Sequence, residues 1–198
     1  MKLYMARHGE TDWNLQQRIQ GRTDTRLNET GRRQAQNLGQ RLQEEGYHIT
    51  KLYTSPQKRA FETAQIVSRM LQVPCERQEG LQEISFGAWE GHTWDEVMAL
   101  YPQEYADWHK HRRTVRTPEG ESYQELLERV VAALCQIIQK ESGKDSQILV
   151  VAHSAVLMSL QWWHQDVSFH EMVHRFRTRN SDFVNLNCEQ ILSKSTAF

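Results

Sequence analysis

Residues 147–153 have the sequence Gln-Ile-Leu-Val-Val-Ala-His, the strongest buried-strand pattern in the chain. A short apolar run without polar alternation is typical of a strand that is covered on both faces of a parallel sheet. A second apolar run, residues 3–6, leads directly into Arg7 and His8. Both predicted strands therefore end at a histidine, one at His8 and the other at His153.

Helical patterns lie between these apolar runs. Asn28 has the chemistry of an N-cap, ahead of apolar residues that recur at spacings of three and four. Ser55 with Pro56 indicates a second helix start, and Ser122 with Glu125 forms a capping box ahead of a third helix. The other predicted elements are a helix over residues 154–163 and weaker strands over residues 48–53 and 183–186.

Strands that alternate with helices predict an α/β fold, here a three-layer α/β/α sandwich with a mostly parallel central sheet. The 198 residues suit a single domain over residues 1–198, with room for an insertion. In open parallel sheets, ligands bind outside the carboxyl ends of the strands. Because His8 and His153 are both expected at such an end, we expect them to meet at one edge of the sheet.

The composition limits the partners of the chain. Its formal net charge of −1 provides no overall attraction to nucleic acid or to an anionic membrane. The first residues contain no signal-peptide pattern, and no run has the length and apolarity of a membrane span. Three widely spaced cysteines match no metal-binding spacing and fit free thiols in a reducing compartment. We therefore expect a cytoplasmic protein that binds neither nucleic acid nor a membrane.

The segment after the first strand is dense in groups that suit phosphate. Arg7 offers a planar set of donors that matches phosphate oxygens bidentately, and Asn14 adds a neutral donor. Gly9 lets the backbone turn sharply or approach a ligand closely. A neutral histidine such as His8 attacks phosphorus through one ring nitrogen when the other nitrogen carries the proton. Taken alone, Arg7 and His8 are better explained as a strand end at the protein surface.

Three further residues have settings that suit phosphoryl chemistry. Arg59 is expected in the first turns of a helix, beside free backbone N–H groups and the positive end of the helix dipole. Glu83 lies among apolar and aromatic neighbours, a setting that raises a carboxyl pKa toward the range of a general acid. His153 ends the strongest strand. Each also has a purely structural explanation, as a solvated helix charge, a loop acid bonded to backbone, and a core histidine.

Together these residues belong to blocks that resemble the histidine phosphatase superfamily and, within it, the phosphoglycerate mutase-like branch. The blocks occur in the order of the family and extend from residue 3 to about residue 160, which makes chance a poor explanation. They are Arg7-His8-Gly9-Glu10-Thr11, Thr54-Ser55-Pro56-x-x-Arg59-Ala60-x-x-Thr63-Ala64, Glu83-x-x-Phe86-Gly87-x-Trp89-Glu90-Gly91, Glu119-Gly120-Glu121-Ser122 and Val151-Ala152-His153.

The resemblance implies a role for each main candidate. His8 would accept the phosphoryl group, oriented by a hydrogen bond from its other ring nitrogen to nearby backbone. Arg7, Arg59 and His153 would form the phosphate pocket, and Glu83 would protonate the leaving oxygen and then activate water. The residues that would complete the substrate pocket are Asn14, Gln20 and Gly21. No metal and no other cofactor is implied, because two arginines and two histidines supply the positive charge that Mg²⁺ supplies elsewhere.

The family fold also implies a helical lid insertion over the site, at about residues 90–120 here. This segment contains a basic run, residues 109–116, in which Arg112 is the best candidate for substrate contact. Ordinary helix packing with a solvated basic face is the better explanation for most residues of the segment. The position after the second histidine is commonly glycine in the family and is Ser154 here. The serine amide would still contact phosphate, and its hydroxyl adds a donor.

The chain is shorter than the mutases that it resembles, whose extra segments hold a phosphorylated glycerate. We therefore predict a histidine-type phosphatase that hydrolyses small-molecule phosphate monoesters, similar to broad-specificity phosphatases and α-ribazole phosphatases. A phosphoglycerate mutase is the alternative. A non-catalytic phosphate-binding module is disfavoured, because binding alone requires neither His8 nor Glu83. The sequence leaves open which phosphate ester is the physiological substrate and whether the protein forms a homodimer.

Overall fold

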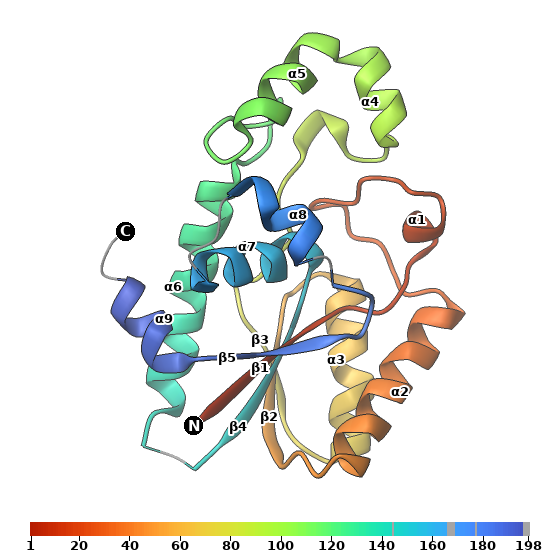
Figure 1. Ribbon diagram of the computed structural model, residues 1–198. Coiled ribbons are helices and arrows are strands. Elements are labelled where there is room, and N and C mark those ends of the chain that lie inside the picture. Colours follow the sequence, from red (N-terminus) through yellow and green to blue (C-terminus); the bar gives the residue numbers. More distant parts are fainter. Residues whose placement is uncertain (144, 166–168, 177, 196–198) are drawn as a thin grey trace.

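In a computed structural model, which describes residues 1–143, 145–165, 169–176 and 178–195, the chain is built around a central sheet (Figure 1). The strand order is β3-β2-β4-β1-β5. Strands β1, β2, β3 and β4 run parallel, and β5 pairs with β1 in the antiparallel sense. The prediction of a mostly parallel sheet is confirmed. The strands are β1 (Lys2–Arg7), β2 (Ile49–Thr54), β3 (Cys75–Arg77), β4 (Gln147–Ala152) and β5 (Phe183–Leu186).

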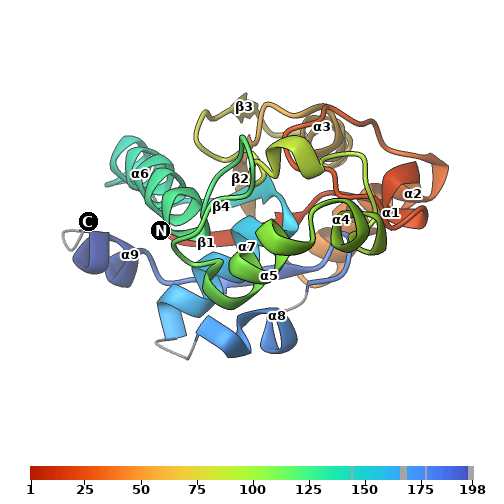
Figure 2. The same cartoon turned by 90° about the horizontal axis from the view of Figure 1, so that it is seen from above.

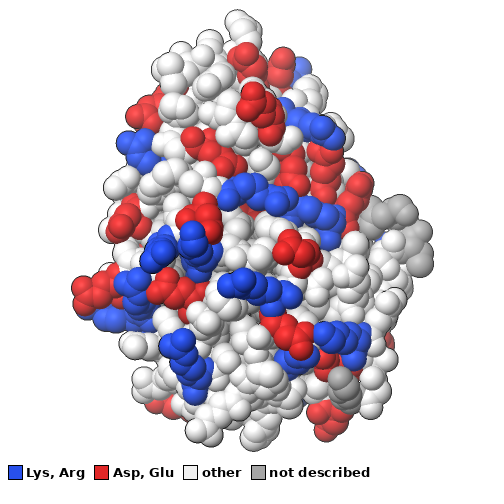
Figure 3. All heavy atoms as spheres, turned by 180° about the vertical axis from the view of Figure 1, so that it is seen from behind, with Lys and Arg blue, Asp and Glu red and all other residues white. Residues whose placement is uncertain are grey.

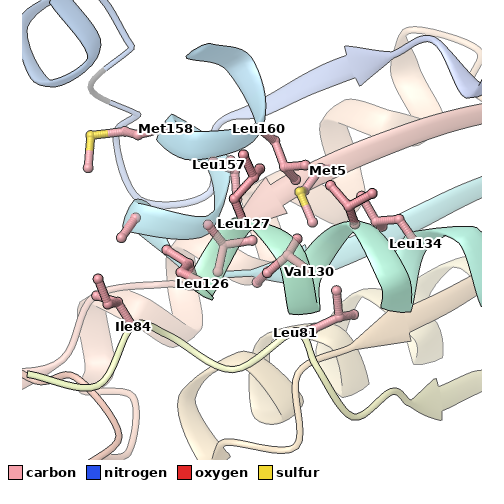
Figure 4. Close-up of a cluster of buried hydrophobic side chains, with 14 of the residues drawn as sticks. Met5, Leu81, Ile84, Leu126, Leu127, Val130, Leu134, Leu157, Met158 and Leu160 are labelled. Carbon is pink, nitrogen blue, oxygen red and sulfur yellow. The ribbon is translucent and has the colours of Figure 1, made fainter. Parts of the chain in front are cut away.

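Helices cover both faces of the sheet because successive strand residues point to opposite sides. In β1, Leu3 and Met5 belong to one apolar core, and Tyr4 and Ala6 belong to the other. The close-up in Figure 4 shows Met5 among apolar side chains of two helices on the first side. These helices are α6 (Tyr123–Glu141) and α7 (Ser154–Gln165), with α9 (Cys188–Ser195) against α6; α2 (Glu29–Glu44) and α3 (Lys58–Leu71) cover the opposite face. The predicted three-layer sandwich is therefore confirmed.

Two of the predicted helix starts are confirmed and one is wrong. The Asn28 side chain caps α2, and Ser122 and Glu125 form the capping box of α6. Ser55 does not begin a helix, since α3 starts at Lys58 after an N-cap at Gln57. The reason is that the chain leaving β2 is still paired with the sheet, where the Ser55 amide donates to the Val151 carbonyl at 3.0 Å.

Two helices stand over the carboxyl ends of the strands, in the segment for which the helical insertion was predicted (Figures 1 and 2). Aromatic side chains hold this segment together: the Trp94 and Trp108 rings stack at 5.4 Å, and Trp89 meets Trp108 edge to face at 5.3 Å. Short elements that the sequence patterns did not predict lie around the same end. The helices of the segment are α4 (Trp94–Leu100) and α5 (Pro102–His111), preceded by η1 (Gly87–Trp89); the short elements include α1 (Asp12–Leu15), η2 (Phe169–Glu171) and α8 (Met172–Arg175).

The surface carries charges of both signs side by side, as the face drawn in Figure 3 shows. This distribution agrees with the formal net charge of −1. Among the described residues, none of the helices combines the length and the apolar character that crossing a membrane requires.

Candidate active site

The topology brings the two histidines together. His8 follows β1 and His153 follows β4, and these two strands are neighbours in the sheet, with Arg7 paired to Ala152 at their ends. The imidazole rings lie with centroids 5.2 Å apart. Both side chains are buried, His8 with 2% and His153 with 0% of its surface exposed. The prediction that they meet at one sheet edge is confirmed, although neither lies at the protein surface.

Hydrogen bonds fix the proton of His8 on one ring nitrogen. Its Nδ1 lies 2.6 Å from the Gly9 carbonyl oxygen, which only accepts, so Nδ1 carries the proton. The Arg59 Nε–H donates to the other nitrogen, Nε2, at 3.3 Å. Burial, assisted by the charges of Arg59 and Arg7, holds the pKa of His8 well below its ordinary value. The ring is therefore neutral at physiological pH, with an unprotonated Nε2.

Arg59 is the second residue of α3 and is fully buried. Its guanidinium donates to the carbonyl oxygens of Gly21 and Thr23, both at 2.8 Å. Burial lowers the pKa of Arg59 to about 10, against the opposing effect of Glu83, so the side chain stays charged at neutral pH. The other arginine of the pair, Arg7, donates from Nη1 to the Thr178 carbonyl at 2.8 Å. Backbone carbonyl oxygens thus accept hydrogen bonds from both arginines at the sheet edge.

Glu83 lies between the sheet edge and the start of α7, with 8% of its surface exposed. Its carboxylate accepts from the amides of Ile84 at 3.1 Å and Ala155 at 3.3 Å. Burial raises the pKa of Glu83, and the nearby Arg59 charge opposes this rise. A carboxyl group with a raised pKa is suited to proton transfer.

Arg129 of α6 holds the loop that carries Glu83 and was not foreseen from the sequence. It donates to the carbonyl oxygens of Gly80, Gln82 and Glu83, at 2.8 to 2.9 Å. It also donates to both carboxylate oxygens of Glu121, and one of them, Oε2, accepts from the Ser85 amide as well, at 2.8 Å. In the sequence Arg129 is one charge on an amphipathic helix, and no local pattern separates it from a solvated one.

Two other residues anchor the machinery from a distance. The side-chain amide of Asn180 donates to the His8 carbonyl at 2.9 Å. Gln57, in the turn before α3, donates from its side chain to the Gly21 carbonyl and accepts from the Glu83 amide. Gln57 therefore joins the loops that carry Gly21 and Glu83. These contacts are long-range, so no sequence spacing indicates them.

The loop at Gly21 is folded around the carboxylate of Glu90. Gly21 has φ +48°, and a side chain there would collide with Glu90. One Glu90 oxygen accepts from the amides of Arg22 and Phe86, at 2.8 and 3.1 Å. The other oxygen accepts from the Thr23 amide at 2.9 Å and from its hydroxyl at 2.7 Å. Glu90 appears in the sequence motif, but its role as an anchor comes only from the folded chain.

We expect Glu90→Gln to lower the free energy of unfolding by about 3 kcal/mol. The substitution replaces one carboxylate oxygen by an NH₂ group, and the backbone N–H groups that donated to that oxygen lose their acceptor. Urea denaturation gives the measurement. Glu29→Gln is the control, because the side chain of Glu29 is 86% exposed and its ion pair with Arg33 spans 3.8 Å. Equal stability of the two variants would contradict the anchoring role.

The candidate residues surround one cavity of about 640 Å³. His153 is fully buried and does not line the cavity, but the next residue, Ser154, does. Aromatic side chains, including Trp94, Tyr105 and Trp108, form the wall contributed by the α4–α5 segment, whereas Tyr101 packs toward Trp89. The predicted site residues in the wall are Arg7, His8, Asn14, Gln20, Gly21, Arg59, Glu83, Arg112 and Ser154.

Polar residues between Thr11 and Thr25 hydrogen-bond to one another. The Thr11 amide donates to the Asn14 side-chain oxygen at 3.1 Å, and the Thr25 hydroxyl donates to the Gln20 side-chain oxygen at 2.6 Å. The side-chain NH₂ groups of Asn14 and Gln20 then remain as donors to a ligand in the cavity. Among the described residues, the site included, no group of three or more His, Cys, Asp or Glu side chains is arranged to hold a metal ion.

Comparisons with a family model, with curated proteins and with solved structures all point to one family. The model of the histidine phosphatase superfamily (branch 1) matches residues 3–190. Phosphoglycerate mutase-like protein 4 of Arabidopsis thaliana is 39% identical over 163 residues, 80% of this chain and 69% of that protein. The uncharacterized phosphatase PhoE of Bacillus subtilis is 36% identical over 156 residues, 79% of this chain and 73% of that protein. Among solved structures, Bacillus stearothermophilus YhfR matches with a TM-score of 0.83 at 33% identity, covering 94% of this chain and 90% of that one.

Proposed function

The chain belongs to the histidine phosphatase superfamily, branch 1, and from this premise we propose that it hydrolyses small-molecule phosphate monoesters through a phosphohistidine at His8, without a metal ion. The observation that carries the proposal is the state of His8. Its unprotonated Nε2 accepts from Arg59 beside a cavity whose wall also contains Glu83 and Arg7. A lone pair, two cations and a raised-pKa carboxyl group thus lie around one space.

In the first half-reaction, the His8 Nε2 lone pair forms a bond to phosphorus while the bond from phosphorus to the ester oxygen breaks. Glu83 gives its proton to the departing oxygen, and an alcohol leaves. In the second half-reaction, water attacks the phosphohistidine and Glu83 takes the proton of that water. Inorganic phosphate forms, and His8 regains its lone pair. Arg7 and Arg59 stabilise the phosphoryl oxygens in both steps.

Phosphoglycerate mutation is the second candidate, because one relative is described as phosphoglycerate mutase-like. It shares the first half-reaction and differs only in the acceptor, which is a second hydroxyl instead of water. The phosphatase is preferred because PhoE, described as a phosphatase, is similar over a comparable share of both chains. The cavity also has room for water beside a departing alcohol, at about 640 Å³.

The test is release of phosphate from p-nitrophenyl phosphate in the presence of excess EDTA. Turnover that is unaffected by EDTA is the expected result. Binding of inorganic phosphate without turnover of any ester would overturn the proposal in favour of a binding module. In parallel, 3-phosphoglycerate is incubated with a trace of 2,3-bisphosphoglycerate. Formation of 2-phosphoglycerate faster than release of phosphate would assign the mutase instead.

Arg112 is the proposed contact for a second negative charge on the substrate. It lies in the cavity wall at the end of α5, with its guanidinium 5.7 Å from the centre of the Trp108 ring. Within the described part of the chain, it forms no ion pair with an acidic side chain, whereas Arg116 of the same basic run is paired with Glu125. A cation without an acidic partner in a cavity wall suits an anionic ligand group.

We expect Arg112→Gln to raise the KM, or the inhibition constant, of 3-phosphoglycerate by about tenfold, since a charge-assisted hydrogen bond contributes about 1.5 kcal/mol or more. The KM, or the inhibition constant, of glycerol 3-phosphate, which lacks the carboxylate, should change by less than about twofold. Arg113→Gln is the matched control, because the neighbouring Arg113 is exposed and donates to Gln124 outside the cavity wall. Equal changes for both ligands would assign Arg112 a structural role only.

A further inference from the structure

Ser55 is in direct contact with the second histidine. Its hydroxyl oxygen lies 2.8 Å from Nε2 of His153, and both side chains have 0% of their surface exposed. Ser55 occupies the turn that follows β2, and the chain around it is held by the sheet and not by a helix. The contact therefore lies at the edge of the sheet, directly before Ser154, which lines the cavity.

The proton of this contact can be assigned by counting donors and acceptors. The Ser55 oxygen already accepts from the Gln57 amide, at 3.3 Å. Its own proton needs an acceptor, because a buried hydroxyl that donates to nothing loses free energy. In the described part of the chain, the acceptor within reach of it is Nε2 of His153. Ser55 is therefore the donor, and Nε2 of His153 carries no proton.

The remaining proton of His153 must then be on Nδ1. Burial, assisted by the Arg59 charge, holds the pKa of His153 well below its ordinary value, so the ring is neutral and has one proton. Nδ1 is buried and has no hydrogen-bond partner among the described residues. A buried N–H group without a partner, 5.2 Å ring to ring from His8, is a donor that a ligand oxygen would satisfy.

We propose that Ser55 is a positioning residue, whose hydroxyl holds His153 in the Nδ1–H tautomer so that this N–H donates to an oxygen of the transferring phosphoryl group. The phosphoryl part rests on the proposed function, whereas the tautomer is a property of the resting protein. Without the Ser55 hydroxyl, no residue that the structure describes hydrogen-bonds to either ring nitrogen of His153 and so selects one tautomer. The Nε2–H form presents a lone pair instead of a donor at Nδ1, which repels a phosphoryl oxygen.

The tautomer is measured first, in the resting wild-type protein, by long-range ¹H–¹⁵N correlation of ¹⁵N-labelled histidine, with His153→Gln identifying the signals. The expected result is a protonated Nδ1 and an unprotonated Nε2, with Nδ1 shifting when orthovanadate is added. Ser55→Ala is expected to give a mixture of tautomers at His153. It should also lower kcat/KM by about 100-fold, the scale of a misplaced catalytic contact. The vanadate inhibition constant should rise by a similar factor.

Two further variants separate this role from simple packing. Ser55→Cys keeps the volume and a weak donor, so its kcat/KM should lie between those of wild type and Ser55→Ala. Thr54→Val is the matched control. It removes a buried hydroxyl that donates to the Ser55 carbonyl, without touching His153. In Thr54→Val, His153 should keep the wild-type tautomer, and kcat/KM should stay within about threefold of the wild-type value.

An Nε2–H tautomer in the wild-type protein would overturn the proposal, whether or not the protein is active. So would a Ser55→Ala variant that keeps both the tautomer and kcat/KM. If Ser55→Ala does not fold, the wild-type spectrum and Ser55→Cys decide the question. If the wild-type protein hydrolyses no phosphate ester, the proposed function fails, and the spectrum with vanadate still tests the tautomer and its ligand separately.

Discussion

His8→Ala is expected to lower kcat/KM for p-nitrophenyl phosphate by on the order of 10⁴-fold or more, the scale seen when a covalent nucleophile is removed. The Gly9 carbonyl holds the His8 ring at Nδ1 and Arg59 holds it at Nε2, so the substitution removes the positioned lone pair that attacks phosphorus. Water attacking the ester directly would be the remaining route, and it lacks a base in the right place.

The binding of phosphate should survive in this variant. Arg59 keeps its anchors at the carbonyls of Gly21 and Thr23, and Arg7 keeps its anchor at Thr178. We therefore expect the dissociation constant of inorganic phosphate to change by less than about tenfold, measured by calorimetry. His48→Ala is the control, because His48 is exposed and lies outside the cavity wall. It should keep full activity.

The intermediate provides a second measurement for the same prediction. Wild-type protein quenched during turnover of a ³²P-labelled ester should carry label that is stable in alkali and lost in acid, as a phosphoramidate is. His8→Ala should carry none. An acid-stable label, or labelling of the variant, would point to a serine or carboxylate nucleophile and would contradict the assignment of His8.

The meeting of His8 and His153 was predictable because it depends on two strong local signals. Residues 3–6 and residues 147–152 are apolar runs that form buried strands, and parallel strands have their carboxyl ends at one edge. The histidines that follow both runs must then be close. In this case a one-dimensional pattern determines a three-dimensional contact, since few alternative arrangements of the strands exist.

The residues that hold the site in place were not predictable in the same way. Ser55 with Pro56 has the local chemistry of a helix start, and only pairing with Val151 of β4 keeps this turn in the sheet. Arg129 and Glu90 differ from surface charges only through the backbone groups that they meet. The short strand β3, Cys75–Arg77, is too brief and too polar to show a period. All of these depend on long-range contacts.

Glu83→Gln should separate substrates by their leaving groups. For an alkyl ester such as glycerol 3-phosphate, the departing alkoxide needs a proton, and we expect kcat/KM to fall by about 10³-fold. For p-nitrophenyl phosphate, the phenolate leaves without a proton, so the first turnover should stay fast. The second half-reaction still lacks its base, so stopped-flow should show a burst of one p-nitrophenol per active site. Glu79→Gln, in the exposed loop nearby, should show neither effect.

The pH dependence tests the same assignment. The pKa of Glu83 is raised by burial, so its acid form persists to higher pH, and kcat/KM for the alkyl ester should fall as pH rises through that pKa. The pKa of His8 is lowered by burial, so activity should fall on the acid side only as pH drops through that lower value. In Glu83→Gln the basic limb should disappear while the acid limb stays. Because the substrate ionises identically in both experiments, its contribution cancels in the ratio of the two profiles. A basic limb that persists in Glu83→Gln would assign the general acid to another residue.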